Sequence, residues 1–246
     1  MFIIAANAGL VAFLLVSLIV GVRLMLLARR TGGFPELLIG TGFVLGGALG
    51  YVPEVLAADG MLPEAFVPIV IVISNGAIRA CAVLTAFFTW RVFRPTDRRA
   101  EATAWTIAAL LAISYIAFPA PWSMANGAGE WGWSLVTASA RTVAFAWAAW
   151  ESLRYWGQTR RRSALGLGDA TTTRRLLLWG LAMVGVSAMS LMTLLYRLLP
   201  SPGPDAAWTL VQSALGLFAA IAMAWAFAPR RRTLERGAAM AGERAR

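Results

Sequence analysis

The chain divides into seven apolar stretches, and its arginines gather at alternate ends of them. The stretches are Phe2–Leu27, Leu37–Ala58, Phe66–Val92, Ala102–Phe118, Trp131–Trp150, Leu176–Leu199 and Ala206–Ala228. Most of them reach the ~20 residues with which a helix crosses the ~30 Å hydrocarbon core of a bilayer. We therefore expect an all-α membrane protein, built as a bundle of seven transmembrane helices.

The distribution of charge predicts the orientation of this bundle. All 22 basic residues are arginines, and nearly all of them follow the first, third, fifth and seventh stretches. Because arginine-rich flanks of membrane helices stay in the cytoplasm, we predict that the N-terminus lies outside and the C-terminus lies in the cytoplasm. Residues 1–228 would then form the membrane domain, and residues 229–246 a basic cytoplasmic tail.

Composition supports this fold class and argues against other partners. Hydrophobic residues make up 59% of the chain and charged residues 14%, unlike the balance of a soluble domain. The net charge of +10 would suit nucleic-acid binding, but the arginines flank apolar spans and do not share one amphipathic face. We therefore expect contact with anionic membrane lipids and no binding of nucleic acid. The abundance of arginine and alanine favours a bacterial inner membrane.

The longest predicted connection is cytoplasmic, from about Glu151 to Arg175, and contains Arg160, Arg161 and Arg162. The tail is too short for a folded effector domain, so an output would have to pass through another chain. The basic clusters of these segments either fix topology and contact headgroups, or they dock a cytoplasmic signalling partner. The sequence leaves both interpretations open.

Glycines recur every four residues in the second stretch, at Gly42, Gly46 and Gly50. This spacing places them on one helical face, and such faces let two helices approach closely within a bilayer. We expect this face to pack within the chain, against the first or the third helix. A homodimer interface is the alternative.

Two arginines are predicted to lie deep in the bilayer. Arg79 falls near the middle of the third stretch and Arg141 about halfway along the fifth. A charge at that depth costs several kcal/mol unless it faces the bundle interior, water or a partner, so both arginines are candidates for a ligand site. The polar residues expected at similar depths, in the outer half of the bundle, are Asn7, Tyr51, Glu54, Asn75, Tyr115 and Gln212.

These polar residues predict a site for an anion. Guanidinium groups bind carboxylate and phosphate bidentately, so Arg79 and Arg141 would hold the anionic group. Asn75 and Gln212 would orient the ligand, and Glu54 would balance the charge of the empty site. The alternatives are a structural role, in which these groups only bond to each other and to backbone carbonyls, and assembly with an acidic helix of a partner.

Several chemistries lack their residues in this sequence. The chain contains no histidine and no lysine, and Cys81 is its only cysteine, so we expect no haem, no metal site, no Schiff base and no disulfide within the chain. No nucleophile or acid–base pair indicates an enzyme. We predict a receptor-like or sensory membrane protein that binds a small anionic or amphiphilic ligand and needs no cofactor. A transporter of such an anion and a structural membrane subunit are the alternatives.

Overall fold

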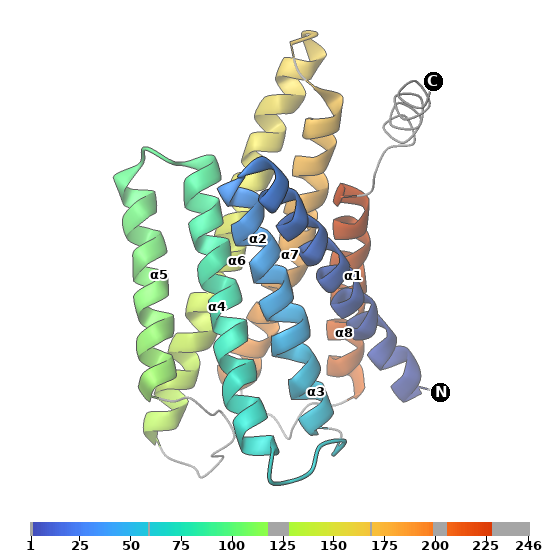
Figure 1. Cartoon of the computed structure of the whole chain (residues 1–246), viewed down its shortest axis with the longest axis vertical. Coiled ribbons are helices and arrows are strands. Elements are labelled where there is room, and N and C mark those ends of the chain that lie inside the picture. Colours follow the sequence, from blue (N-terminus) through green and yellow to red (C-terminus); the bar gives the residue numbers. More distant parts are fainter. Residues whose placement is uncertain (1, 59, 118–127, 168, 199–205, 228–246) are drawn as a thin grey trace.

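A computed structural model describes residues 2–58, 60–117, 128–167, 169–198 and 206–227, and these residues form helices without any strand (Figure 1). The elements are α1 (Phe2–Thr31), α2 (Phe34–Val44), the π-helix η1 (Leu45–Tyr51), α3 (Val52–Ala58), α4 (Val67–Phe93), α5 (Arg98–Ala117), α6 (Ala128–Ala164), α7 (Ala170–Leu198) and α8 (Ala206–Phe227). The predicted all-α fold is confirmed, and each predicted stretch coincides with one helix or with the continuous run from α2 through η1 to α3.

Six helical segments of the described residues are long and apolar enough to cross a membrane. These segments are Val11–Thr31, Phe34–Tyr51, Val67–Phe93, Arg98–Ala117, Ala170–Leu195 and Leu210–Phe227. Helix α6 is longer than any of them, with 37 residues, but Arg141 and several serines and threonines make it less apolar. The structure therefore indicates a multi-pass membrane protein with six such helices among the described residues, and the count of seven spans stays a prediction.

The surface of the bundle is as apolar as lipid requires. Leu15, Ile19, Ile73 and Ile116 point away from the bundle, and Ile116 is 81% exposed. A soluble protein avoids an apolar surface of this extent, whereas a bilayer solvates it. The interior is instead filled by small residues that are almost fully buried, namely Ala82, Ala86, Ala104, Ala144, Ala148, Ala182 and Ala219.

The arginines flank one end of the bundle. Helices α1, α4 and α6 all end at the top of Figure 1, so the turns that join α1 to α2, α4 to α5 and α6 to α7 lie at the same end. We call it the arginine-rich end, because these turns and the helix ends beside them contain Arg29, Arg94, Arg99 and Arg160. The predicted alternation of charge along the chain is thus a real segregation in space, for the part of the chain that the structure describes.

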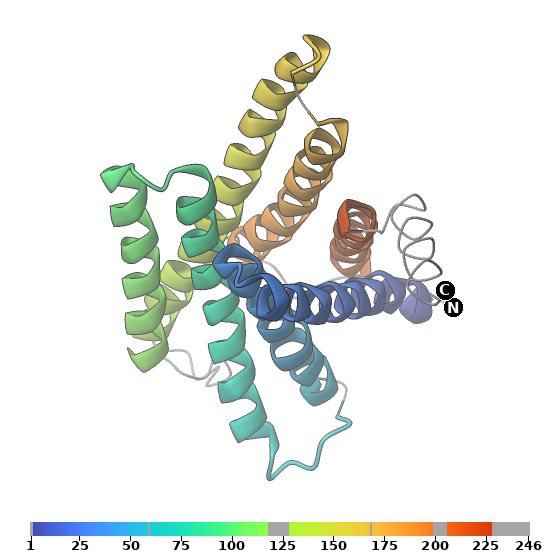
Figure 2. The ribbon, with the colours of Figure 1, turned by 45° about the horizontal axis from the view of Figure 1, so that its top comes forward.

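The predicted cytoplasmic loop from Glu151 to Arg175 is wrong for most of its length. Helix α6 continues to Ala164 and α7 begins at Ala170, which leaves a short turn between them. The apolar stretch ends at Trp150, but no proline follows it, so nothing stops the helix until Gly166, whose φ of 75° suits a helix end. The two helices form a hairpin that extends beyond the other helix ends (Figures 1 and 2).

The glycines of the second stretch pack within the chain, as the sequence predicted. A Cβ atom added to Gly46 would lie 2.8 Å from Sγ of Cys81, and one added to Gly50 would lie 2.5 Å from Cγ1 of Ile78, both on α4. Gly47 instead faces Ser17 on α1. Both glycine faces are therefore covered by helices of the same chain.

Candidate functional site

Arg79 is buried in the middle of α4, with 6% of its surface exposed. Its Nη2 atom donates a long hydrogen bond to Oγ1 of Thr137 on α6, at 3.4 Å. Its guanidinium carbon lies 5.3 Å from the centre of the Tyr115 ring on α5, within the range of a cation–π interaction. The sequence correctly predicted that Arg79 faces the protein and not lipid.

Tyr115 reaches this arginine because α4 leaves room for its ring. A Cβ atom on Gly76 would lie only 3.0 Å from the Tyr115 hydroxyl oxygen, so any larger residue at this position would push the ring away. The hydroxyl donates to the carbonyl oxygen of Val72 at 3.2 Å. Tyr115 therefore binds α4 at two levels, through its hydroxyl and through its ring face.

Arg141 lies one helical turn beyond Thr137 on the same face of α6. Its Nη2 atom donates to the hydroxyl of Tyr51 at 2.9 Å. Its Nε atom is buried and has no hydrogen-bond partner, and no acidic side chain among the described residues forms an ion pair with it. The Arg79 side chain thus contacts α6 one turn before Arg141.

The π-helix η1 brings Tyr51 to this position. In the run Leu45–Tyr51 each backbone hydrogen bond spans five residues instead of the four of an α-helix. The N–H of Val52, for example, bonds the carbonyl oxygen of Gly47. Pro53, two residues after the end of η1, has no N–H to continue an α-helical ladder through this turn. A π-helix rotates the residues after it relative to an α-helix, and π-turns are frequent at functional sites. The sequence analysis did not predict this element.

The other predicted site residues are placed differently. Asn75, one turn from Arg79, donates to the carbonyl oxygen of Ile71 in its own helix at 3.1 Å. Gln212 lies on α8, which packs against α1 and α7, so the structure does not bring it together with the two arginines. The side chains of Asn7 and Glu54 lie outside the described residues.

A small cavity of about 40 Å³ adjoins the arginine site. Its wall includes Tyr51, which binds Arg141, and Phe145, which lies one turn beyond Arg141 on α6. The wall is otherwise mostly apolar, but it includes Ser17 of α1, whose hydroxyl is buried and has no hydrogen-bond partner. No pattern in the sequence indicates this cavity, because its lining comes from α1, α2, η1, α4, α6 and α7.

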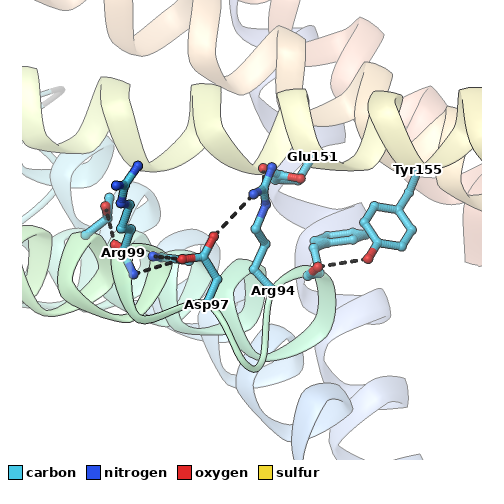
Figure 3. A network of polar contacts seen from close by, with 8 residues as sticks. Arg94, Asp97, Arg99, Glu151 and Tyr155 are labelled. Carbon is cyan, nitrogen blue, oxygen red and sulfur yellow. Dashed lines mark hydrogen bonds and ion pairs between the residues drawn. The ribbon is translucent and has the colours of Figure 1, made fainter.

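A second polar cluster lies at the arginine-rich end (Figure 3). Nε of Arg94, which follows α4, lies 2.9 Å from Oε1 of Glu151 on α6, and Nη1 of Arg94 lies 3.3 Å from Asp97. The hydroxyl of Tyr155 donates to the carbonyl oxygen of Phe93 at 2.9 Å. Glu151, which the sequence analysis assigned to a loop, is only 3% exposed. The sequence signal that could have placed Glu151 on a helix is its position directly after the apolar stretch that ends at Trp150.

Hydrogen bonds in this cluster shift the pKa values of Asp97 and Arg94 in the directions that favour their ionised forms. The backbone N–H of Arg99, then that of Ala100 and the Arg94 side chain, bond the Asp97 carboxylate and lower its pKa. The hydrogen bond to Glu151 is the main reason why the pKa of Arg94 is raised. Asp97 at the same time caps the start of α5, so the turn between α4 and α5 is fixed to both of its helices and to α6.

Among the described residues, no three histidine, cysteine, aspartate or glutamate side chains lie close enough together to hold a metal ion.

No protein-family model, no curated protein and no solved structure matches this chain. The fold and the site define the class only, an α-helical multi-pass membrane protein with two arginines set into its interior.

Proposed function

We propose that this protein is a receptor-like or sensory seven-helix membrane protein that binds a small anionic ligand at Arg79 and Arg141. The observation that supports the proposal best is the burial of the Arg141 Nε atom: among the residues that the structure describes, it has no hydrogen-bond partner and no acidic side chain pairs with Arg141. A buried charge of this kind is costly, and a bound carboxylate or phosphate would satisfy it bidentately.

The seventh span in this proposal is α6. It packs against α4, α5 and α7, and it passes both the arginine site and the arginine-rich end. Its polar residues, among them Thr137 and Arg141, bond other helices or their own backbone, so they do not need to face lipid. With the arginine-rich end in the cytoplasm by the positive-inside rule, the N-terminus is outside.

The hairpin of α6 and α7 would pass the signal to a cytoplasmic partner. Glu151 pairs with Arg94, which fixes the level of the α4–α5 turn on α6, and Leu165 at the hairpin tip follows 14 residues later. At 1.5 Å per residue the tip lies about 21 Å beyond that level, farther than the headgroup layer extends. The tip is therefore proposed to stand in water and not among lipids.

The hairpin surface suits an acidic protein. Its exposed arginines are Arg154, Arg160, Arg161, Arg162, Arg174 and Arg175. Leu165 and Leu167 are 75% and 79% exposed at its tip, where they offer apolar contact area beside the positive charge. Four of these arginines, Arg154, Arg160, Arg161 and Arg162, lie on α6 together with Arg141. One helix therefore connects the ligand site to the docking surface.

The binding claim is tested by calorimetry on the purified protein with acetate, butyrate and inorganic phosphate as probes. We expect saturable binding of at least one anion, weakened at least about tenfold by Arg141→Met or Arg79→Met, because hydrogen bonds to charged groups are worth about 1.5–3 kcal/mol. Arg98→Met, at an exposed arginine of the arginine-rich end, is the matched control and should bind as the wild type does.

Two results would contradict this function. If Arg141→Met binds every anion like the wild type, the anion site is not at Arg141. If the wild type binds none of them and Arg141→Met is more stable than the wild type, the arginines have the structural role instead. Counterflow of a labelled anion in proteoliposomes separates the receptor from the alternative of a transporter: binding without flux supports the receptor.

A further inference from the structure

We infer that the cavity beside Tyr51 holds the tail of the ligand, and that the ligand is a short-chain carboxylate of about four carbons with a hydroxyl group toward its far end. This inference rests on the proposed anion site at Arg141 and specifies its ligand class. It is drawn from three observations: the position of the cavity, its size, and the Ser17 hydroxyl in its wall.

The position of the cavity connects it to the anion site. Tyr51 belongs to both, since its hydroxyl accepts a hydrogen bond from Arg141 and its side chain lines the cavity. Phe145 also lines the cavity and lies one turn from Arg141 on the same face of α6. A carboxylate held by Arg141 would therefore direct its substituent past Tyr51 into the cavity.

The size of the cavity limits the length of that substituent. A water molecule needs about 10–15 Å³ of such space. The volume of about 40 Å³ thus accommodates roughly three to four heavy atoms. Most of the wall is apolar, with Phe13, Phe43, Ile78 and Met183, so methylene groups are favoured over water there. A carboxylate followed by three or four heavy atoms, as in butyrate or 4-hydroxybutyrate, fills the space, and the five-carbon tail of hexanoate exceeds it.

The Ser17 hydroxyl indicates a polar group on the ligand. Ser17 is 1% exposed, lines the cavity, and has no hydrogen-bond partner among the described residues. A buried hydroxyl without a partner costs about 1–3 kcal/mol, which an occupant with its own hydroxyl group would recover. The ligand is therefore amphiphilic, with its groups in a defined order. Its carboxylate lies at Arg141, its methylene groups lie along the apolar wall, and its hydroxyl group lies at Ser17.

The test measures the dissociation constants of acetate, propionate, butyrate, hexanoate and 4-hydroxybutyrate for the purified full-length protein. From acetate to butyrate we expect a gain of about fourfold per methylene, followed by a loss at hexanoate. We expect 4-hydroxybutyrate to bind about tenfold more tightly than butyrate, and Ser17→Ala to remove this preference while it leaves butyrate binding intact.

Glycine variants test the cavity from its other wall. A Cβ atom on Gly47 would lie 3.1 Å from Cβ of Ser17, so Gly47→Ala narrows the cavity and should shift the preferred chain length toward acetate and propionate. Gly132→Ala is the matched control, because its Cβ atom meets nothing within 4 Å. Where Gly47→Ala does not fold, the chain-length series on the wild type and the Ser17→Ala comparison decide the question.

The results of this binding series distinguish a failure of the cavity inference from a failure of the proposed function. If carboxylates bind and Arg141→Met weakens them, but affinity shows neither a length optimum nor a Ser17-dependent preference for the hydroxyl group, the cavity inference fails and the anion site stands. If the wild type binds phosphate but no carboxylate, the cavity inference fails and the anion site stands. If the wild type binds none of these anions, both fail. A length optimum together with a preference lost in Ser17→Ala supports both.

Discussion

The side chain of Arg94 reaches from the end of α4 to Glu151 on α6, with 2.9 Å between Nε and Oε1. This pair joins the helix that contains Arg79 to the helix that contains Arg141. Ten residues, or about 15 Å of helix, separate Arg141 from Glu151, and the hairpin follows directly. A ligand that moved α6 relative to α4 would have to strain the Arg94–Glu151 pair. The pair therefore lies between the proposed anion site and the hairpin that is proposed to contact the partner.

Replacing Arg94 with alanine should destabilise the protein. Glu151 is 3% exposed, so the change would leave a buried carboxylate without its cation. Since Arg94 itself is 29% exposed, water replaces part of the lost interaction, and we expect a loss of about 2 kcal/mol in the free energy of unfolding. Denaturant titration in bicelles measures this change.

Arg98→Ala is the control for that experiment, because Arg98 is exposed and lies in the same turn region. Its free energy of unfolding should change by less than about 0.5 kcal/mol. Equal effects of the two substitutions would mean that the pair contributes nothing beyond surface charge.

Two glycines of one helix face should differ sharply in their tolerance of alanine. At Gly50 the new Cβ atom would lie 2.5 Å from Cγ1 of Ile78 and 3.0 Å from the carbonyl oxygen of Leu45. Overpacking of this kind costs about 1–3 kcal/mol. At Gly42 the nearest atom would be Cβ of Leu84 at 3.7 Å, an ordinary contact. We expect Gly50→Ala to lower the Tm clearly and Gly42→Ala to leave it almost unchanged. A reversed order would contradict the packing of η1 against α4.

The turn of the hairpin should lose order only in strong acid. The N–H of Thr171 and then the side chain and N–H of Thr172 bond the carboxylate of Asp169 and lower its pKa to about 2, below its usual 3.8. The stabilisation is therefore fully present above the usual pKa and is lost as the pH falls through about 2. Titration of the Asp169 carboxyl carbon by NMR measures this pKa directly. A midpoint near the usual 3.8 would contradict the hydrogen bonds from Thr171 and Thr172 to this carboxylate.

Single cysteines test the orientation of the bundle. Leu165→Cys at the hairpin tip and Met61→Cys between α3 and α4, each in a Cys81→Ala background, lie at opposite ends of the bundle. We expect an impermeant maleimide to label Cys at position 61 in intact cells and Cys at position 165 only in inverted vesicles. Labelling of position 165 from outside would reverse the proposed orientation.

The sequence predicted the features that depend on composition along one helix. The apolar stretches, the burial of Arg79 and the close packing at Gly46 follow from the cost of polar groups in lipid and from the spacing of small residues. The depth of a residue along its helix could be read from the chain in the same way.

What the sequence could not provide is which helices are neighbours. Asn75 and Gln212 were predicted at a depth similar to that of Arg79, but α8 packs on α1 and α7, so equal depth did not bring Gln212 to the site. Glu151 was placed in a loop because hydropathy falls after Trp150, although a helix needs a stop residue and not only a polar one to end. The π-turns that aim Tyr51 at Arg141 have no simple pattern in sequence.

The Nε–H group of Arg141 offers the most direct test of the proposed anion site. In protein labelled with ¹⁵N-arginine, the Arg141 Nε resonance is assigned by its loss in Arg141→Lys and followed during titration with butyrate. We predict a saturable downfield shift, because Nε has no hydrogen-bond partner within the described part of the chain and gains a carboxylate oxygen when the ligand binds. Saturable binding of butyrate that leaves this resonance unmoved would contradict the assignment of the site to Arg141.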